Sequence, residues 1–193
     1  REPGAGVFRA AEASRPARLP VAGPAGRQAA RARLEAGRSA INAGSFDPGA
    51  RSLARAAAEA KACGAHGLEV ESWLALGTAL VHSARGRDEE GAHALLRASA
   101  LAEEHGLGDV AAGAYRELGY VDILQARYAR CAQRLERAAT LAESDEERAG
   151  VEAMLGLAAA DTGAHERALA HLRRSVELAE RGSRRSISWS SAL

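Results

Sequence analysis

A nine-residue phrase occurs four times along the 193-residue chain, and this repeat limits the possible folds more than any other feature. Its first leucine recurs at intervals of 42, 40 and 37 residues. A period of this size is typical of arrays in which every repeat is one small unit of secondary structure that packs on its neighbours. The four copies are 53–61 (LARAAAEAK), 95–103 (LLRASALAE), 135–143 (LERAATLAE) and 172–180 (LRRSVELAE).

The phrase has the spacing of one face of an α-helix. In the third copy, Leu135 is followed three residues later by Ala138 and three residues after that by Leu141. Residues three or four apart share a helical face. Aromatic residues make up only 4% of the chain, which disfavours a β-sheet fold, because strands are enriched in aromatic and β-branched residues. The repeat therefore predicts an all-α protein.

A second signature, an apolar or small residue followed by glycine, precedes each phrase by 16 or 18 residues. A glycine inside a helix costs about 1 kcal/mol relative to alanine, so four glycines in register indicate close approach of a partner helix. The glycines are Gly37, Gly77, Gly119 and Gly156, and the matching small residues, four before each leucine, are Gly49, Gly91, Cys131 and Ala168. Leu118 and Leu155, each directly before a glycine, are expected to be buried between helices.

Capping and turn residues divide the repeat region into eight helices. Asp47-Pro48 is typical of a helix start, and Gly163 and Gly182 are typical of helix ends. The predicted helices are 26–43, 48–63, 68–84, 89–105, 109–125, 129–143, 146–161 and 165–181. They form four predicted hairpins, at 26–64, 68–106, 109–144 and 146–182. Since each hairpin exposes an apolar face until the next one stacks on it, the pattern predicts a solenoid.

The two ends of the chain are assigned separately. Residues 1–25 are interpreted as a linker or as the remnant of a preceding repeat, and residues 183–193 as a tail or the start of a fifth repeat. Trp189 supports a fifth repeat, because it has the same spacing to residue 193 as Trp73 has to Gly77. The chain is therefore expected to be a fragment of a longer array.

The first helices carry the residues of a known family. Trp73-x-x-Leu76-Gly77-x-x-Leu80 and Tyr115-x-x-Leu118-Gly119 resemble the first helix of the tetratricopeptide repeat, and the resemblance extends over 26–182. It implies a right-handed superhelical solenoid of about four repeats. The periods exceed the roughly 34 residues of that family, so longer helices are expected. Long copies rich in alanine and arginine are similar to the repeat arrays of large actinobacterial ATPase regulators that end in a LuxR-type DNA-binding domain.

The resemblance places the first helices on a concave wall, where residues four apart share one face. In register with the family, this wall carries Leu34, Arg38, Asn42, Leu74, Thr78, His82, Arg116, Tyr120, Leu124, Ala153, Leu157 and Asp161. The predicted groove for a ligand or partner consists of the polar and aromatic members Arg38, Asn42, Thr78, His82, Arg116 and Tyr120. Histidine is the side chain that titrates nearest to neutral pH, so His82 predicts a pH dependence of binding.

Catalytic and metal-binding motifs are not found in the sequence. GLGDVAAG at 106–113 is interpreted as an inter-helix turn, because no strand precedes it. The spacing of Cys63, Cys131 and the six histidines fits no metal site, so no catalytic residue, metal or cofactor is predicted. The net charge of +1, with acidic and basic residues interleaved, argues against direct nucleic-acid binding. No membrane span is predicted, and a cytoplasmic location is expected.

Three functions remain open from the sequence. The first is a non-catalytic scaffold or sensor module that binds a protein or peptide in the concave groove, as part of a larger signalling or regulatory protein. The alternative is the small-molecule inducer-binding region of a LuxR-type ATPase transcriptional regulator. The third is a purely structural spacer without a groove ligand.

Overall fold

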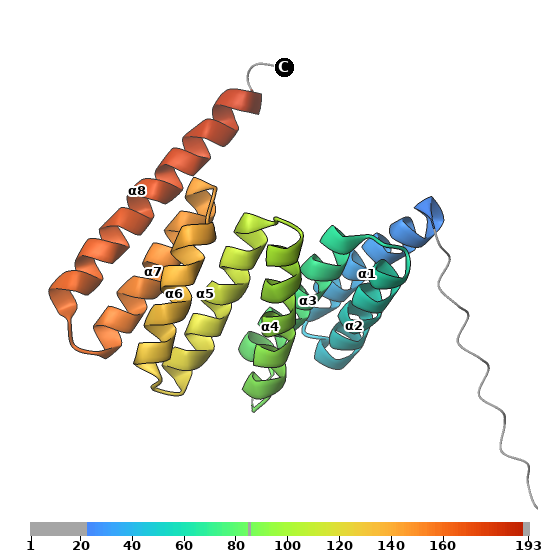
Figure 1. Cartoon of the computed structure of the whole chain (residues 1–193), viewed down its shortest axis with the longest axis horizontal. Helices are drawn as coiled ribbons and strands as arrows, with labels where there is room; N and C mark the ends of the chain where they lie inside the picture. The colour runs from blue at the N-terminus through green and yellow to red at the C-terminus, as the bar shows by residue number, and fades with distance from the viewer. Residues whose placement is uncertain (1–22, 85, 191–193) are drawn as a thin grey trace, which may run out of the picture.

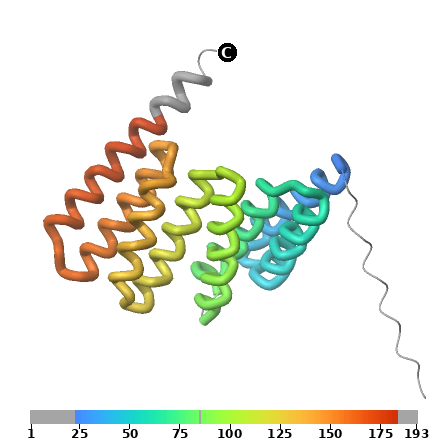
Figure 2. Tube along the Cα trace, viewed as in Figure 1, coloured from blue at the N-terminus to red at the C-terminus, as the bar shows by residue number. Residues whose placement is uncertain are grey.

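The computed structural model describes the backbone of residues 23–84 and 86–190, and the side chains as far as residue 183. Within these residues the chain forms eight α-helices and no β-strand, which confirms the all-α prediction. The helices follow one another in chain order along the long axis of the molecule (Figures 1 and 2). They are α1 (Pro24–Asn42), α2 (Phe46–Ala62), α3 (His66–Ser83), α4 (Asp88–Glu104), α5 (Gly108–Leu124), α6 (Tyr128–Leu141), α7 (Asp145–Asp161) and α8 (His165–Ser190).

Helices α1 to α7 begin and end within two residues of their predicted bounds, but the predicted helix end at Gly182 is wrong. The glycine does not adopt the left-handed conformation of a helix cap. It packs instead on the start of α7, where a Cβ atom at Gly182 would lie 3.7 Å from the backbone nitrogen of Glu146. Residues 183–190 therefore continue α8 in place of the predicted tail. Residues 191–193 and most of the predicted linker at 1–25 lie outside the described residues.

Consecutive helices pair into four antiparallel hairpins that stack side by side. The first helices of neighbouring hairpins also touch one another, α1 with α3, α3 with α5 and α5 with α7. In the part of the chain that the structure describes, the second helices α2, α4, α6 and α8 make no such contact with each other. The first helices therefore form the crowded inner layer of the array and the second helices its outer layer. This is the architecture of a tetratricopeptide-like solenoid.

The close approach predicted at the four glycines is confirmed. A Cβ atom added to Gly77 would lie 2.6 Å from Leu95 Cγ and 3.0 Å from the carbonyl oxygen of Gly91. Similar contacts join Gly37 to Leu53 at 2.8 Å, Gly119 to Leu135 at 3.0 Å and Gly156 to Leu172 at 2.9 Å. In every hairpin, the glycine of the first helix thus receives the leading leucine of the second helix.

Burial of the signature leucines follows the stacking order. Leu53, Leu95 and Leu135 are at most 1% exposed, whereas Leu172 on the last helix is 43% exposed. Leu118 is fully buried, as predicted, but Leu155 is only partly buried, so that prediction is wrong. The first three hairpins are each covered by a following hairpin, and the described residues provide no such cover for the fourth.

The α5–α6 turn is stabilised differently from the other turns. The α1–α2, α2–α3, α3–α4, α4–α5 and α7–α8 turns each place a glycine at positive φ, but the α5–α6 turn places Ala126 there, at φ 53°. This conformation is strained for alanine. Asp122 holds the residues after this turn, because its buried carboxylate accepts hydrogen bonds from Arg127 and Arg130 at 2.9 and 2.8 Å. The backbone bond from the Arg127 amide to the Asp122 oxygen, at 2.7 Å, has a counterpart in four of the glycine turns.

The glycine contacts predict opposite effects for two alanine substitutions in α3. Gly77→Ala should lower the free energy of unfolding by about 1–3 kcal/mol, because the new methyl group overlaps Leu95. Gly67→Ala is the matched control, since nothing lies within 4 Å of its added Cβ atom. It should leave stability unchanged or raise it by up to about 1 kcal/mol through higher helix propensity. Urea denaturation followed by circular dichroism measures both, and equal effects would contradict the close-approach model.

Candidate partner-binding groove

Four of the six predicted groove residues line one cavity between α1 and α3. The cavity has a volume of about 460 Å³. Its apolar surface comes from Ile41, Leu53, Leu74, Ala75 and Ala79, and its polar surface from Arg38, Asn42, Thr78, His82 and Ser83. The structure therefore brings Arg38, Asn42, Thr78 and His82 to one cavity, as the sequence predicts. The apolar side chains that line the same cavity are not among the six predicted groove residues.

Arg116 and Tyr120 lie on α5, outside this cavity, and connect to it through His82. The rings of His82 and Tyr120 stack with their centroids 4.8 Å apart. Nε2 of His82 also donates a hydrogen bond to Glu117 Oε2 at 2.7 Å, and Glu117 pairs in turn with Arg116 at 3.5 Å. The inner layer thus carries a continuous row of polar contacts from α3 to α5.

The charged groove residues all have carboxylate partners that the sequence analysis missed. Glu71 lies 3.8 Å from Arg38, Glu117 pairs with His82, and Glu147 lies 3.0 Å from Arg116. Glu71 could have been found, because it precedes Leu74 by three residues and shares its helical face. Glu117 likewise precedes Tyr120 by three residues, but the basic residue that each carboxylate contacts was out of reach of sequence reasoning, because all three pairs join different repeats.

The Arg116–Glu147 pair connects α5 to α7, and two glycines make room for it. A Cβ atom at Gly150 would lie 3.0 Å from the Arg116 guanidinium, and one at Gly113 would lie 3.4 Å from Glu147 Oε1. The paired atoms, Arg116 Nε and Glu147 Oε1, are buried and attract by charge without an aligned hydrogen bond. Burial raises the pKa of Glu147 above its ordinary value, although the Arg116 charge opposes this shift.

Apolar side chains extend the groove surface along α5 and α7. Leu124 is 51% exposed and Leu157 is 38% exposed, at positions predicted to share the wall with Tyr120. Leu34 was also assigned to this wall, and that assignment is wrong, because Leu34 is buried in the core between α1, α2 and α3. The middle of α1 therefore contributes packing where the later first helices contribute surface.

Neither cysteine provides reactive chemistry. Cys131 is buried beside Gly119, and this burial raises the pKa of its thiol to about 11. Cys63 is partly buried, and its thiol donates a hydrogen bond to the Ala60 carbonyl at 3.3 Å. Among the described residues, no cluster of histidine, cysteine and carboxylate side chains is arranged to hold a metal ion. No described helix is both long and apolar enough to cross a membrane.

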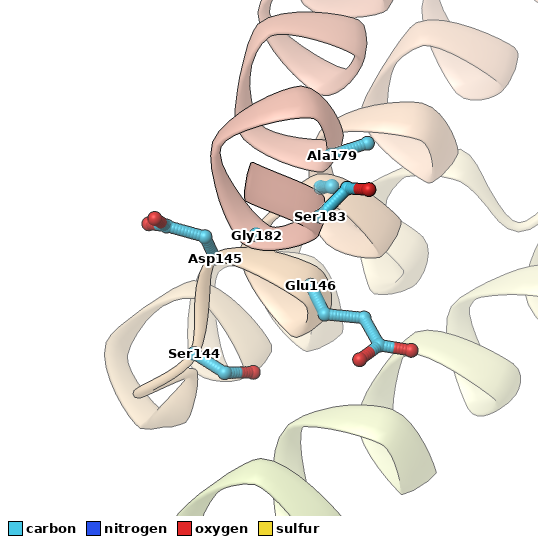
Figure 3. Close-up of a pocket in the computed structure, with 7 residues that line it drawn as sticks. Ser144, Asp145, Glu146, Ala179, Gly182 and Ser183 are labelled. Atoms are coloured by element: carbon cyan, nitrogen blue, oxygen red, sulfur yellow. The ribbon is translucent and has the colours of Figure 1, made fainter. Parts of the chain in front are cut away.

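A second concavity, of about 480 Å³, lies where α8 passes the start of α7 (Figure 3). Ser144, Asp145 and Glu146 line it from α7, and Ala179, Gly182 and Ser183 line it from α8. Ser144 caps α7, since its hydroxyl accepts a hydrogen bond from the Glu147 amide at 3.1 Å. Asp109 holds this α6–α7 linker, because its carboxylate accepts bonds from the Glu143 and Ser144 amides at 2.7 and 3.0 Å. These contacts fix the α6–α7 linker at the edge of the concavity.

Comparisons with known proteins support the fold. The crystal structure of MamA, a tetratricopeptide-like helical repeat protein, matches with a TM-score of 0.55 and 20% sequence identity, over 80% of this chain and 81% of that one. A second solved structure, MamA MSR-1 C2, matches at 20% identity over 79% of this chain and 97% of that one, with a TM-score of 0.33. No family model matches the chain, and no curated protein matches it. At this identity the likeness to MamA shows the tetratricopeptide-like solenoid fold alone.

The buried ion pair predicts a pH-dependent loss of stability. Arg116→Ala leaves the Glu147 carboxylate buried without its partner, and should lower the free energy of unfolding by about 1–3 kcal/mol at neutral pH. The pKa of Glu147 then rises further in the folded state, so the folded variant binds a proton more readily than the unfolded chain. Its stability deficit should therefore shrink as the pH falls from neutral towards the ordinary glutamate value of about 4.3.

Urea titrations at several pH values measure this deficit. Arg174→Ala is the control, because Arg174 pairs with Glu152 at 3.0 Å but is largely exposed. Removing such a surface pair should cost about 1 kcal/mol or less, with little change over the same pH range. A deficit for Arg116→Ala that grows as the pH falls would show that the Glu147 charge is not destabilised by burial.

Proposed function

We propose that the chain is a non-catalytic scaffold or sensor module that binds a protein or peptide along its inner layer of first helices. The main support is the surface formed by the α1–α3 cavity, the His82–Tyr120 stack and the exposed leucines of α5 and α7. Such a surface offers apolar anchor sites with polar groups between them, as protein-binding sites commonly do. The tetratricopeptide-like fold is consistent with a protein partner.

The charges of this groove favour an apolar contact over a charged one. Arg38, His82 and Arg116 each lie beside a carboxylate of the same inner layer, so their attraction for an acidic partner is largely compensated. Leu124 and Leu157, in contrast, expose apolar surface on α5 and α7. We infer a partner segment that places apolar side chains over α5 and α7 and polar groups over α1 and α3.

The proposal extends to the cellular setting. We propose a cytoplasmic module within a larger signalling or regulatory protein, in which groove occupancy is transmitted by changes in curvature of the solenoid. Direct contact with nucleic acid is not part of this proposal, because acidic and basic residues interleave along the helices.

Two substitutions on the groove surface test the proposal. Peptides are selected on the wild-type chain from a random display library, and the best binder is then titrated by fluorescence anisotropy. Leu124→Glu/Leu157→Glu should weaken its binding about tenfold or more, because both leucines are exposed anchor candidates whose loss removes about 1.4 kcal/mol or more.

Leu96→Glu is the matched control, since Leu96 on α4 is 45% exposed on the outer layer. It should leave the affinity nearly unchanged. Selected peptides that bind the groove double variant as tightly as the wild type would contradict the groove assignment. So would an equal loss with Leu96→Glu.

A small-molecule inducer is the second candidate, and the α1–α3 cavity favours it. The cavity volume of about 460 Å³ falls within the range of ligand pockets. A metabolite that binds there should raise the thermal midpoint of the wild type but not that of Thr78→Trp, whose indole would fill the cavity. The Leu124→Glu/Leu157→Glu variant should keep the response. Stabilisation of Thr78→Trp by the same metabolite would exclude this cavity as its site.

A further inference from the structure

Helix α8 presents an apolar face that nothing in the described chain covers. Leu169, Leu172 and Val176 are 54%, 43% and 57% exposed, and they are three of the six exposed large hydrophobic side chains among the described residues. The neighbouring face of α8 packs on α7 through Ala168, which is 4% exposed, and the covered side of Leu172 contacts Gly156. The exposed face lies on the last helix of the described chain, at the end opposite α1 (Figure 1). Clusters of this kind on a surface are typical of interaction sites.

A second copy of the chain cannot cover this face with its α1 in the manner of a further repeat. In α3, the residues that pack on the preceding hairpin include Leu68, Ala75 and Ala79. Forty residues earlier, α1 carries Gln28, Glu35 and Ser39, and all three are exposed. Stacking α1 on α8 would bury the Glu35 charge against leucines without a partner, which is unfavourable. Head-to-tail growth of the array is therefore disfavoured.

The spacing of the exposed residues fits another arrangement. His165, Leu169, Leu172 and Val176 follow one another at intervals of four, three and four residues, which is the spacing of the seam between two helices of a coiled coil. A seam can pair with an identical seam that runs in the opposite direction, because a twofold axis brings the same surface of both copies together.

The charges beside the seam select one register of this pairing. If Leu169 packs against Leu172 of a second copy, Val176 lies against His165 of that copy and Glu166 comes opposite Arg173 of that copy, and the twofold axis creates each contact twice. Sliding the helices by one heptad would instead bring Arg173 towards Arg173 of the second copy, which is repulsive. Both residues are exposed, and neither has an ion-pair partner among the described residues. We propose that the chain forms an isologous dimer through antiparallel α8 helices, held by this seam and by two Glu166–Arg173 pairs.

The first test measures the mass of the full chain by light scattering after gel filtration, from low to high micromolar concentration. The wild type should approach twice the mass of one chain as its concentration rises. Leu169→Glu/Val176→Glu should remain monomeric, while the outer-layer control Leu96→Glu should behave like the wild type. A wild-type chain that stays monomeric throughout would overturn the proposal and leave the face to a different occupant. Equal dissociation of the Leu96→Glu control would also overturn it.

A charge exchange tests the register and separates it from general hydrophobic association. Glu166→Arg and Arg173→Glu should each raise the dimer dissociation constant several-fold, because each single change places like charges opposite one another. The double variant Glu166→Arg/Arg173→Glu should restore wild-type dimerisation. Circular dichroism checks that every variant is folded. Failure of the double variant to recover, or single variants that dimerise normally, would overturn the antiparallel pairing. None of these residues lies in the proposed groove, so the two proposals fail independently.

Discussion

The contact between a glycine on the first helix and a leucine on the second is the constraint on which the rest of the structure depends. It recurs in all four hairpins, with virtual Cβ distances of 2.6 to 3.0 Å to the leucine. Because the glycine has no side chain, the leucine lies directly on the backbone of its partner helix. The two helices therefore cross at a fixed point, and the same geometry repeats down the chain. Regular stacking is a consequence of this uniformity.

Close packing within the hairpins brings the first helices together on one side. On that side, polar pairs join neighbouring first helices. Arg116 on α5 pairs with Glu147 on α7, and His82 on α3 pairs with Glu117 on α5. Gly113 and Gly150 provide the space for the first of these pairs. The inner layer is thus connected from hairpin to hairpin by polar contacts, and its apolar side chains remain available.

The sequence predicted the hairpins well and the surface only in part. Helix bounds and glycine contacts are encoded within about forty residues, so Gly77 and Leu95 could be paired from their spacing. The wall was predicted from the family resemblance and helical periodicity, which brought Arg38 and His82 to one cavity but placed the buried Leu34 on the surface. Periodicity fixes a face of a helix without fixing which neighbour covers it. The same limit explains Gly182, where packing on α7 and not a turn determines the residue.

Packing within a hairpin and packing between hairpins depend on different residue positions, and this difference explains why the first and last described helices expose different surfaces. Contacts within a hairpin are kept in every copy, including the last, where Leu172 still lies 2.9 Å from a Cβ position at Gly156. Contacts between hairpins depend on the outward positions of each helix, and these change at α1, which carries Glu35 where α3 carries Ala75. The exposed face of α1 therefore carries polar residues where α3 carries apolar ones. At the α8 end, Leu172 is retained because it packs on Gly156 within its own hairpin. The part of Leu172 that this hairpin leaves exposed is then available for a further contact.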